Sequence, residues 1–198
     1  MSTDAPLQGV PALVLGAGFG TRLRPLTEHI PKPAVPVLGR PLIGHPLIHL
    51  YAAGCTEVHV NAFHQAQRLM TTLDAWVQRR LTRLRLSWSV EGPEILGTGG
   101  ALRKLEGPLC APGGPLLLLN GDAILGMDLP RLFAAHERNR AEGALATLLC
   151  LPSPDAERFG AVRVEPGSGR ILDLAGLGRP PGTSDEQAAA GTPTIFCG

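Results

Sequence analysis

Lysine is almost absent from this sequence, because only Lys32 and Lys104 are lysines among its 18 basic residues. Charge is scarce in general: charged residues make up 18% of the chain and the formal net charge is +1, against roughly 25% charged residues in soluble domains. There is no block of basic residues that would bind a nucleic-acid backbone or an anionic membrane. We therefore expect neither nucleic acid nor membrane as a partner.

Long apolar runs are missing as well, and no stretch approaches the ~18 consecutive apolar residues of a membrane span. The N-terminal segment 1–9 lacks the basic start and apolar run of a signal peptide. The four cysteines form no C-x-x-C pair, which argues against a zinc site or a disulfide framework. These absences together predict a cytoplasmic protein with free, buried thiols.

Glycine (25) and proline (19) are abundant, yet 44% of the residues are hydrophobic. The hydrophobic residues lie in runs that can offset the entropy of ordering the chain, so we exclude a disordered protein. A length of 198 residues suits one domain, or one domain with an appendage.

Strand patterns alternate with helix patterns over about the first 150 residues. Strands are predicted at 10–15, 57–61, 85–90 and 115–119, and helices at 41–53, 65–80, 98–105 and 128–140. Strands predominate afterwards, at 144–151, 161–165, 170–174 and 194–197. This order predicts an α/β fold with a Rossmann-like open, mostly parallel sheet flanked by helices and a strand-rich C-terminal extension. Residues 1–9 are expected to be a flexible tail and 175–193 a mobile loop.

The first predicted strand leads into a glycine-rich loop, Gly16-Ala17-Gly18-Phe19-Gly20-Thr21-Arg22. Thr21 stands where a dinucleotide fingerprint needs its third glycine, and the prolines that follow prevent a helix, which excludes an NAD-dependent oxidoreductase. The G-K-[ST] ending of the other phosphate-binding loop is missing too. Backbone N–H groups followed by Arg22, Arg24 and Lys32 instead suit a polyphosphate.

The segment from Gly16 through Thr27 and Pro31-Lys32-Pro33 to Ile43 resembles the signature of sugar-1-phosphate nucleotidyltransferases. These enzymes join a nucleoside triphosphate to a sugar 1-phosphate and release pyrophosphate. The resemblance implies a nucleotide-binding loop in which the backbone at Gly16, Ala17 and Gly18 lies along the nucleoside, with Gly20 and Thr21 beside it. It also implies that Arg22 contacts the β- and γ-phosphates and Lys32 the α-phosphate. The family usually has alanine at Gly16, a departure that we expect to matter little sterically.

Two later segments agree with this resemblance. The stretch from Glu94 to Ala101 resembles the loop that reads the base, with Gly97 against the base edge; neither Glu91 nor Glu94 is given a role. Asp122 follows the leucine-rich strand in Asn120-Gly121-Asp122, which is also turn-forming chemistry. At the carboxyl end of a buried parallel strand, the Asp122 carboxylate can hold Mg²⁺ against phosphate oxygens. The resemblance likewise implies that Asp122 binds Mg²⁺.

The sugar side of the site is less well defined. Gly160 lies in a segment that resembles the family's sugar-side turn, and Thr194 and Gly198 lie in one that resembles the strand lining the sugar pocket. The family's Glu-Lys-Pro is replaced around Arg179, which leaves the sugar open. The base-loop segment resembles mannose-1-phosphate guanylyltransferases and N-acetylmuramate-1-phosphate uridylyltransferases alike, so either GTP or UTP is expected as the nucleotide substrate.

The expected reaction is an in-line attack of the sugar phosphate on the α-phosphorus, with Arg22, Lys32 and Asp122 as the catalytic residues. The family usually supplies a second metal-binding aspartate in a later Asp-Ile/Val-Gly-Thr motif, which this sequence does not contain. We therefore expect residues 1–198 to be one nucleotidyltransferase catalytic domain that is incomplete at its C-terminus. The alternative is a non-catalytic module that binds nucleotide sugars, or an inactive fragment.

Overall fold

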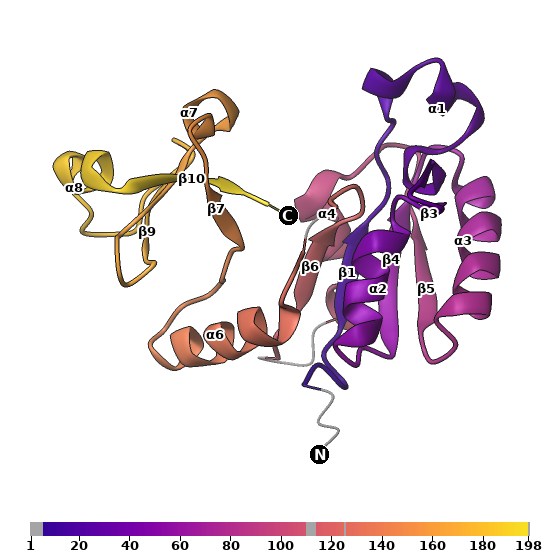
Figure 1. Ribbon diagram of the computed structural model, residues 1–198, viewed down its shortest axis with the longest axis horizontal. Coiled ribbons are helices and arrows are strands. Elements are labelled where there is room, and N and C mark those ends of the chain that lie inside the picture. The colour runs from indigo at the N-terminus through magenta and orange to yellow at the C-terminus, as the bar shows by residue number, and fades with distance from the viewer. Residues whose placement is uncertain (1–5, 110–113, 125, 198) are drawn as a thin grey trace. The chain divides into compact units, whose positions relative to one another are not determined.

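The computed structural model describes residues 6–109, 114–124 and 126–197, and the chain divides into two compact units, Met1–Arg138 and Asn139–Gly198 (Figure 1). Each unit has its own sheet.

The first unit is an α/β layer structure. Its elements are β1 (Ala12–Leu15), η1 (Thr21–Leu23), α1 (Leu26–His29), η2 (Lys32–Ala34), β2 (Pro36–Val37), β3 (Arg40–Pro41), α2 (Gly44–Ala52), β4 (Glu57–Ala62), α3 (Ala66–Arg80), β5 (Arg85–Val90), α4 (Gly97–Lys104), α5 (Glu106–Leu109), β6 (Leu117–Asn120) and α6 (Leu129–Ala141), the last of which spans the division between the units. The predicted helix at 41–53 begins at Gly44, because Pro41 pairs with Pro36 in the short hairpin of β2 and β3.

Four parallel strands form the main sheet in the order β5-β4-β1-β6. The chain adds β4 and β5 on one side of β1 and then returns to place β6 on the other. In open α/β sheets, ligands bind outside the carboxyl ends of the strands at such a reversal. The prediction of an open parallel sheet is therefore confirmed, and the reversal lies between β1 and β6.

Helices cover both faces of this sheet because successive strand side chains point to opposite sides. Val14 packs in one cluster with Leu47 of α2 and Leu73 of α3, while Leu13 packs with Ala101 of α4 on the other face. All five side chains are fully buried. Burial of each large aliphatic side chain stabilises the fold by about 1.5–3 kcal/mol.

The N-terminal segment is anchored where the structure describes it. Leu7 is fully buried in the core cluster of β1 and α2, and its N–H donates to the carbonyl of Ala53 at 3.2 Å. Residues 6–9 therefore do not belong to the flexible tail expected at 1–9, because Leu7 is packed in the core. Residues 1–5 of that prediction lie outside the described residues.

The second unit is an antiparallel sheet with two short helices. Its elements are β7 (Cys150–Pro152), α7 (Ala156–Phe159), β8 (Val162–Val164), β9 (Ile171–Leu174), α8 (Asp185–Ala190) and β10 (Thr192–Phe196), with strand order β7-β10-β8-β9. This confirms the strand-rich C-terminal extension. The strand predicted at 144–151 is observed as β7, which covers only Cys150–Pro152. It begins at Cys150 because its partner β10 ends at Phe196, the residue opposite Cys150.

The segment 175–193, predicted to be a loop, contains helix α8. Ser184 and Gln187 form a capping box: Gln187 N–H donates to Ser184 Oγ at 3.2 Å, and Ser184 N–H donates to Gln187 Oε1 at 2.9 Å. Two otherwise unpaired N–H groups are thereby satisfied. The abundance of glycine and proline around this signal obscured a helix that the S-x-x-Q spacing indicates.

No helix among the described residues is long and apolar enough to cross a membrane. Three described cysteines, Cys55, Cys150 and Cys197, are free thiols, as predicted, although only Cys55 is buried. Burial raises the pKa of the Cys55 thiol to about 11 and also raises that of Cys150.

Candidate active site

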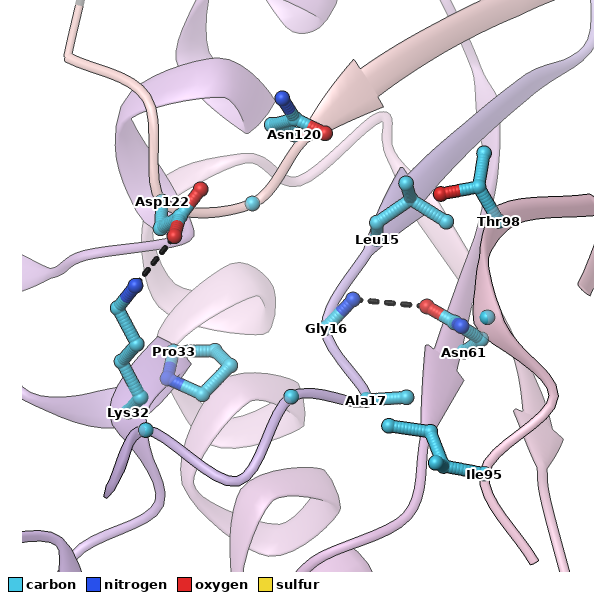
Figure 2. A pocket seen from close by; sticks show the side chains of 14 residues that line it. Leu15, Gly16, Ala17, Lys32, Pro33, Asn61, Ile95, Thr98, Asn120 and Asp122 are labelled. Carbon is cyan, nitrogen blue, oxygen red and sulfur yellow. Dashed lines mark hydrogen bonds and ion pairs between the residues drawn. The ribbon is translucent and has the colours of Figure 1, made fainter. Parts of the chain in front are cut away.

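A cavity of about 260 Å³ opens at the carboxyl ends of β1, β4 and β6 in the first unit (Figure 2). It lies at the strand reversal where the fold predicts a ligand site. Its lining comprises Leu15, Gly16, Ala17, Gly18, Gly20, Lys32, Pro33, Asn61, Ile95, Gly97, Thr98, Asn120, Gly121 and Asp122. The structure thus brings together the glycine-rich loop, the lysine, the base-loop segment and the aspartate, although Lys32 and Asp122 are 90 residues apart in sequence.

The glycine-rich loop leaves β1 in close contact with β4. A Cβ atom at Gly16 would lie 2.9 Å from the carbonyl oxygen of Asn61 and 3.3 Å from Val60 Cγ1. Because real Cβ atoms do not approach a backbone oxygen so closely, alanine at this position would require a shift of the backbone. The expectation that glycine in place of alanine matters little sterically was therefore wrong. Gly16 also donates its N–H to Asn61 Oδ1 at 2.7 Å, so this N–H is already used within the protein.

Lys32 is held by the far end of the same loop. Gly20 has a left-handed backbone (φ 65°), and a Cβ there would lie 2.8 Å from Lys32 Cβ. Thr27, which is buried, donates its hydroxyl to the Gly20 carbonyl at 2.9 Å. The stem of the lysine side chain therefore lies against a bend that glycine permits without strain.

Asp122 is placed by an equally close contact between β1 and the chain after β6. Gly121 donates its N–H to the Leu15 carbonyl at 2.9 Å, and a Cβ at Gly121 would lie 2.4 Å from that oxygen. The next residue, Asp122, forms an ion pair with Lys32, and these two side chains are 49% and 30% exposed. Figure 2 shows the pair at the side of the cavity opposite Gly16 and Asn61.

The N-terminus of α4 forms another part of the lining. Gly97, with φ 67°, begins the helix after Leu96, and both Gly97 and Thr98 line the cavity. The first N–H groups of a helix lack intrahelical partners and attract negative charge. This geometry is compatible with the predicted role of Gly97 beside a nucleotide, which stays a prediction.

Two buried residues lie beside this cavity: Asn61, which sequence reasoning missed and which also lines it, and Glu91, which sequence reasoning left without a role. Asn61 Nδ2 donates to Glu91 Oε1 at 2.7 Å, and Glu91 Oε2 accepts from Leu96 N–H at 2.7 Å. Glu94, by contrast, is exposed. A polar residue at the carboxyl end of each of two neighbouring strands is the sequence signal that could have identified them.

Some predicted site residues lie elsewhere. Thr21 and Arg22 are exposed in η1 and do not belong to the cavity lining. Gly160 and Thr194 belong to the second unit, where Thr194 is buried and its hydroxyl donates to the Val162 carbonyl at 2.7 Å. Gly198 lies outside the described residues. The roles of these five residues stay predictions.

The carboxylate of Asp122 is the one acidic group among the described residues that line the cavity. Within the described part of the chain, no group of three or more His, Cys, Asp or Glu side chains could hold a metal by itself. A single carboxylate nevertheless fits Mg²⁺, which is commonly held by one or two carboxylates together with substrate phosphates and water. The donor chemistry is therefore compatible with a metal that is bound jointly by protein and substrate.

Comparison with known proteins bears directly on this arrangement. The sequence pattern of the family described as nucleotidyl transferase matches residues 11–176. The chain belongs to the nucleotidyl transferase family. The match begins just before β1 and covers the glycine-rich loop, Lys32, Asn61, Glu91 and Asp122, so every residue that forms this cavity lies inside the family region.

Several curated relatives of this chain carry the name mannose-1-phosphate guanyltransferase. The protein from Yarrowia lipolytica is 32% identical over 159 residues, and that from Emericella nidulans is 33% identical over 162 residues. These alignments cover 80% and 82% of this chain, but only 42% and 43% of the relatives. The chain therefore spans less than half the length of these curated relatives.

Solved structures share the fold at lower sequence identity. UDP-glucose pyrophosphorylase from Acinetobacter baumanii has a TM-score of 0.70 at 18% identity. The alignment covers 95% of this chain and 72% of the pyrophosphorylase chain. HddC from Yersinia pseudotuberculosis, solved in complex with GMP-PN, has a TM-score of 0.66 at 20% identity. This alignment covers 95% of this chain and 74% of the HddC chain. These similarities confirm the predicted fold class.

Proposed function

We propose that this chain binds a nucleoside triphosphate in the cavity of its first unit and transfers the nucleotidyl group to a sugar 1-phosphate. The observation that carries the proposal is the convergence of Lys32, Asp122, the glycine-rich loop and the start of α4 on one cavity. An ammonium, a carboxylate and free N–H groups are what a triphosphate with a bound cation requires. Family membership and the names of the curated relatives support the same activity.

In the proposed reaction, a phosphate oxygen of the sugar 1-phosphate attacks the α-phosphorus of the nucleotide. The bond from this phosphorus to the bridging oxygen of pyrophosphate breaks as the new phosphorus–oxygen bond forms, so pyrophosphate leaves with the electron pair. Phosphoryl-type transfer depends mainly on positioning and on neutralisation of charge. Lys32 Nζ would meet the charge on the phosphates, and the glycine-rich loop would position the nucleoside.

Asp122 is the residue proposed to hold Mg²⁺. The ion would supply positive charge that offsets the negative charge of the phosphates. In the structure Asp122 pairs with Lys32 instead, so both side chains must exchange this partner when a triphosphate enters. Their partial exposure allows such a change without disturbing the core.

GTP and mannose 1-phosphate are the first substrate pair to test, because several relatives carry the name mannose-1-phosphate guanyltransferase. UTP is the second nucleotide to test, as the base-loop segment resembles uridylyltransferases as well. The choice of nucleotide thus rests on the names of the relatives for GTP and on the base-loop resemblance for UTP.

The test is pyrophosphate release by the purified chain with each of the common nucleoside triphosphates and a panel of sugar 1-phosphates in Mg²⁺. We expect release with one nucleotide–sugar pair well above all others. Lys32→Met and Arg22→Ala should each reduce that rate, by about a hundredfold for a charge that meets the transferred group. Tight nucleotide binding without release for any pair would instead favour a non-catalytic binding module.

A further inference from the structure

Asn61 and Glu91 form a buried bridge between two loops that line the cavity. Asn61 lies near the end of β4, the strand between β1 and β5, and is 3% exposed; Glu91 directly follows β5 and is 5% exposed. On one side Asn61 Oδ1 accepts from Gly16 N–H, and on the other Glu91 Oε2 accepts from Leu96 N–H, both at 2.7 Å. The central hydrogen bond, from Asn61 Nδ2 to Glu91 Oε1, is also 2.7 Å long.

The bridge joins backbone groups that belong to the two nucleotide-facing segments. Gly16 begins the glycine-rich loop, and Leu96 is the N-cap of α4, directly before Gly97. Glu91 is itself fixed to the sheet, since its N–H donates to the Ala62 carbonyl at 2.8 Å. The separation of the two segments is therefore determined by one side chain on β4 and one directly after β5, two strands that are paired in a fixed register.

The order of donors and acceptors along this bridge requires one amide and one carboxylate side chain. Both ends of the bridge are backbone N–H donors, so the two side chains must offer more acceptors than donors between them. One amide and one carboxylate satisfy this condition, because an amide offers a donor and an acceptor whereas a carboxylate offers acceptors only. Two amides leave two donors opposed, and two carboxylates leave two acceptors opposed.

We propose that Asn61 and Glu91 are positioning residues that set the spacing between the glycine-rich loop and the start of α4, and thereby the affinity for the nucleoside triphosphate. This proposal rests on the proposed function. Neither side chain is required to touch the reacting atoms. Their effect acts through Gly16 and Leu96, the residues whose N–H groups they hold.

Two isosteric substitutions break the bridge without removing volume. In Glu91→Gln, any orientation of the two amides opposes a pair of donors, and in Asn61→Asp two carboxylates face each other. Leaving a buried polar group without a hydrogen-bond partner costs enough free energy to weaken nucleotide binding by about ten- to a hundredfold, if binding depends on the position of that group. We expect the KM for the nucleoside triphosphate to rise by this factor while the KM for the sugar 1-phosphate stays unchanged.

The double variant Asn61→Asp with Glu91→Gln restores the pattern with the two roles exchanged. The carboxylate introduced in β4 would accept from Gly16 N–H and from the amide introduced after β5. The carbonyl of that same amide side chain would accept from Leu96 N–H, so every donor has an acceptor again. We expect the nucleotide KM of the double variant to return to within about threefold of the unaltered chain, a recovery that independent substitutions could not give.

Glu57→Gln is the matched control because it makes the same change at the opposite end of the same two strands. Glu57 begins β4 and is 3.5 Å from Arg85 Nη2 of β5, but it is about half exposed and lies outside the cavity lining. The Glu57→Gln variant should have the same KM for the nucleoside triphosphate as the unaltered chain. Amide hydrogen exchange at Gly16 and Leu96 provides a second measurement that does not depend on turnover.

The expected result is a selective rise in nucleotide KM and faster exchange at both amides in each single variant, with recovery of both in the double variant. Unchanged KM and exchange in the single variants, or a double variant no better than the worse single one, would overturn the proposal. A fall in kcat with all KM values unchanged would also overturn it, because that result indicates loss of folded enzyme only. If the unaltered chain neither binds nor converts any nucleotide, the proposed function fails. The claim about loop spacing is then decided by the exchange data alone.

Discussion

The two units of this chain use their polar side chains in opposite ways. In the first unit, polar residues gather where parallel strands end, and Lys32 and Asp122 remain partly exposed beside a cavity. In the second unit, Arg179 donates to Asp173 at 2.9 Å and also pairs with Asp185, while Arg163 pairs with Glu157. The ion pair of the first unit lies beside a cavity that a ligand could enter, whereas those of the second unit are not among the residues that line this cavity.

The sheet topology explains this difference. Parallel strands require crossover connections, so their carboxyl ends collect loops from distant parts of the sequence around one point. The short antiparallel strands of the second unit instead place their charged residues beside neighbours in the same unit. The charged side chains proposed to bind the triphosphate thus lie in the first unit, whereas Arg163 and Arg179 form ion pairs within the second.

The largest expected effect comes from removing the carboxylate charge in the first unit. Asp122→Asn should reduce pyrophosphate release by about a hundredfold or more, because the proposed cation site loses its charge. The melting temperature should change little, since the side chain is about half exposed. Asp185→Asn, the same substitution at an exposed ion pair of the second unit, should leave release unchanged; an equal loss in both variants would contradict the contrast between the units.

A smaller effect is expected from the close approach of β1 and β4. Gly16→Ala should lower the free energy of unfolding by about 1–3 kcal/mol, because the new Cβ meets a backbone oxygen at 2.9 Å. Gly18→Ala is the matched control, as a Cβ there has no neighbour within 4 Å. Denaturant unfolding of both variants measures the difference, and equal stability would show that the strand ends can separate without cost.

The smallest effect concerns the ion pairs of the second unit. The hydrogen bond from Arg179 and that from the Gly176 N–H hold the pKa of Asp173 below its ordinary value. A lowered pKa means that this contribution to stability is present above the ordinary aspartate pKa of 3.8 and is lost as the pH falls through the pKa of the folded state.

Thermal unfolding between about pH 2.5 and 7 can measure this contribution. Arg179→Met should lower the melting temperature near pH 7 by a few degrees at most, because the arginine is exposed, and the difference from the unaltered chain should shrink below about pH 4. A difference that is the same at every pH would mean that Arg179 acts through packing and not through its charge.

Much of this architecture could be predicted from the sequence. The alternation of apolar runs predicted the parallel sheet, and the glycine-rich loop, Lys32 and Asp122 lie at the cavity where the strand pattern and the family resemblance together placed a site. The bridge of Asn61 and Glu91 could not be predicted, because it depends on the order β5-β4-β1-β6 and on a register that brings residues 30 positions apart together. The steric need for Gly16 was missed for the same reason: the atom it avoids belongs to a different strand.

The most direct test of the account is to titrate the isotopically labelled chain with a non-hydrolysable GTP analogue in Mg²⁺ and to follow its backbone amide signals by NMR. If the cavity of the first unit is the nucleotide site, the signals of Gly18, Gly97 and Asp122 should shift together along one saturable curve. Asp122→Asn should weaken that curve. Saturable binding that leaves all three signals unmoved would contradict the placement of the site.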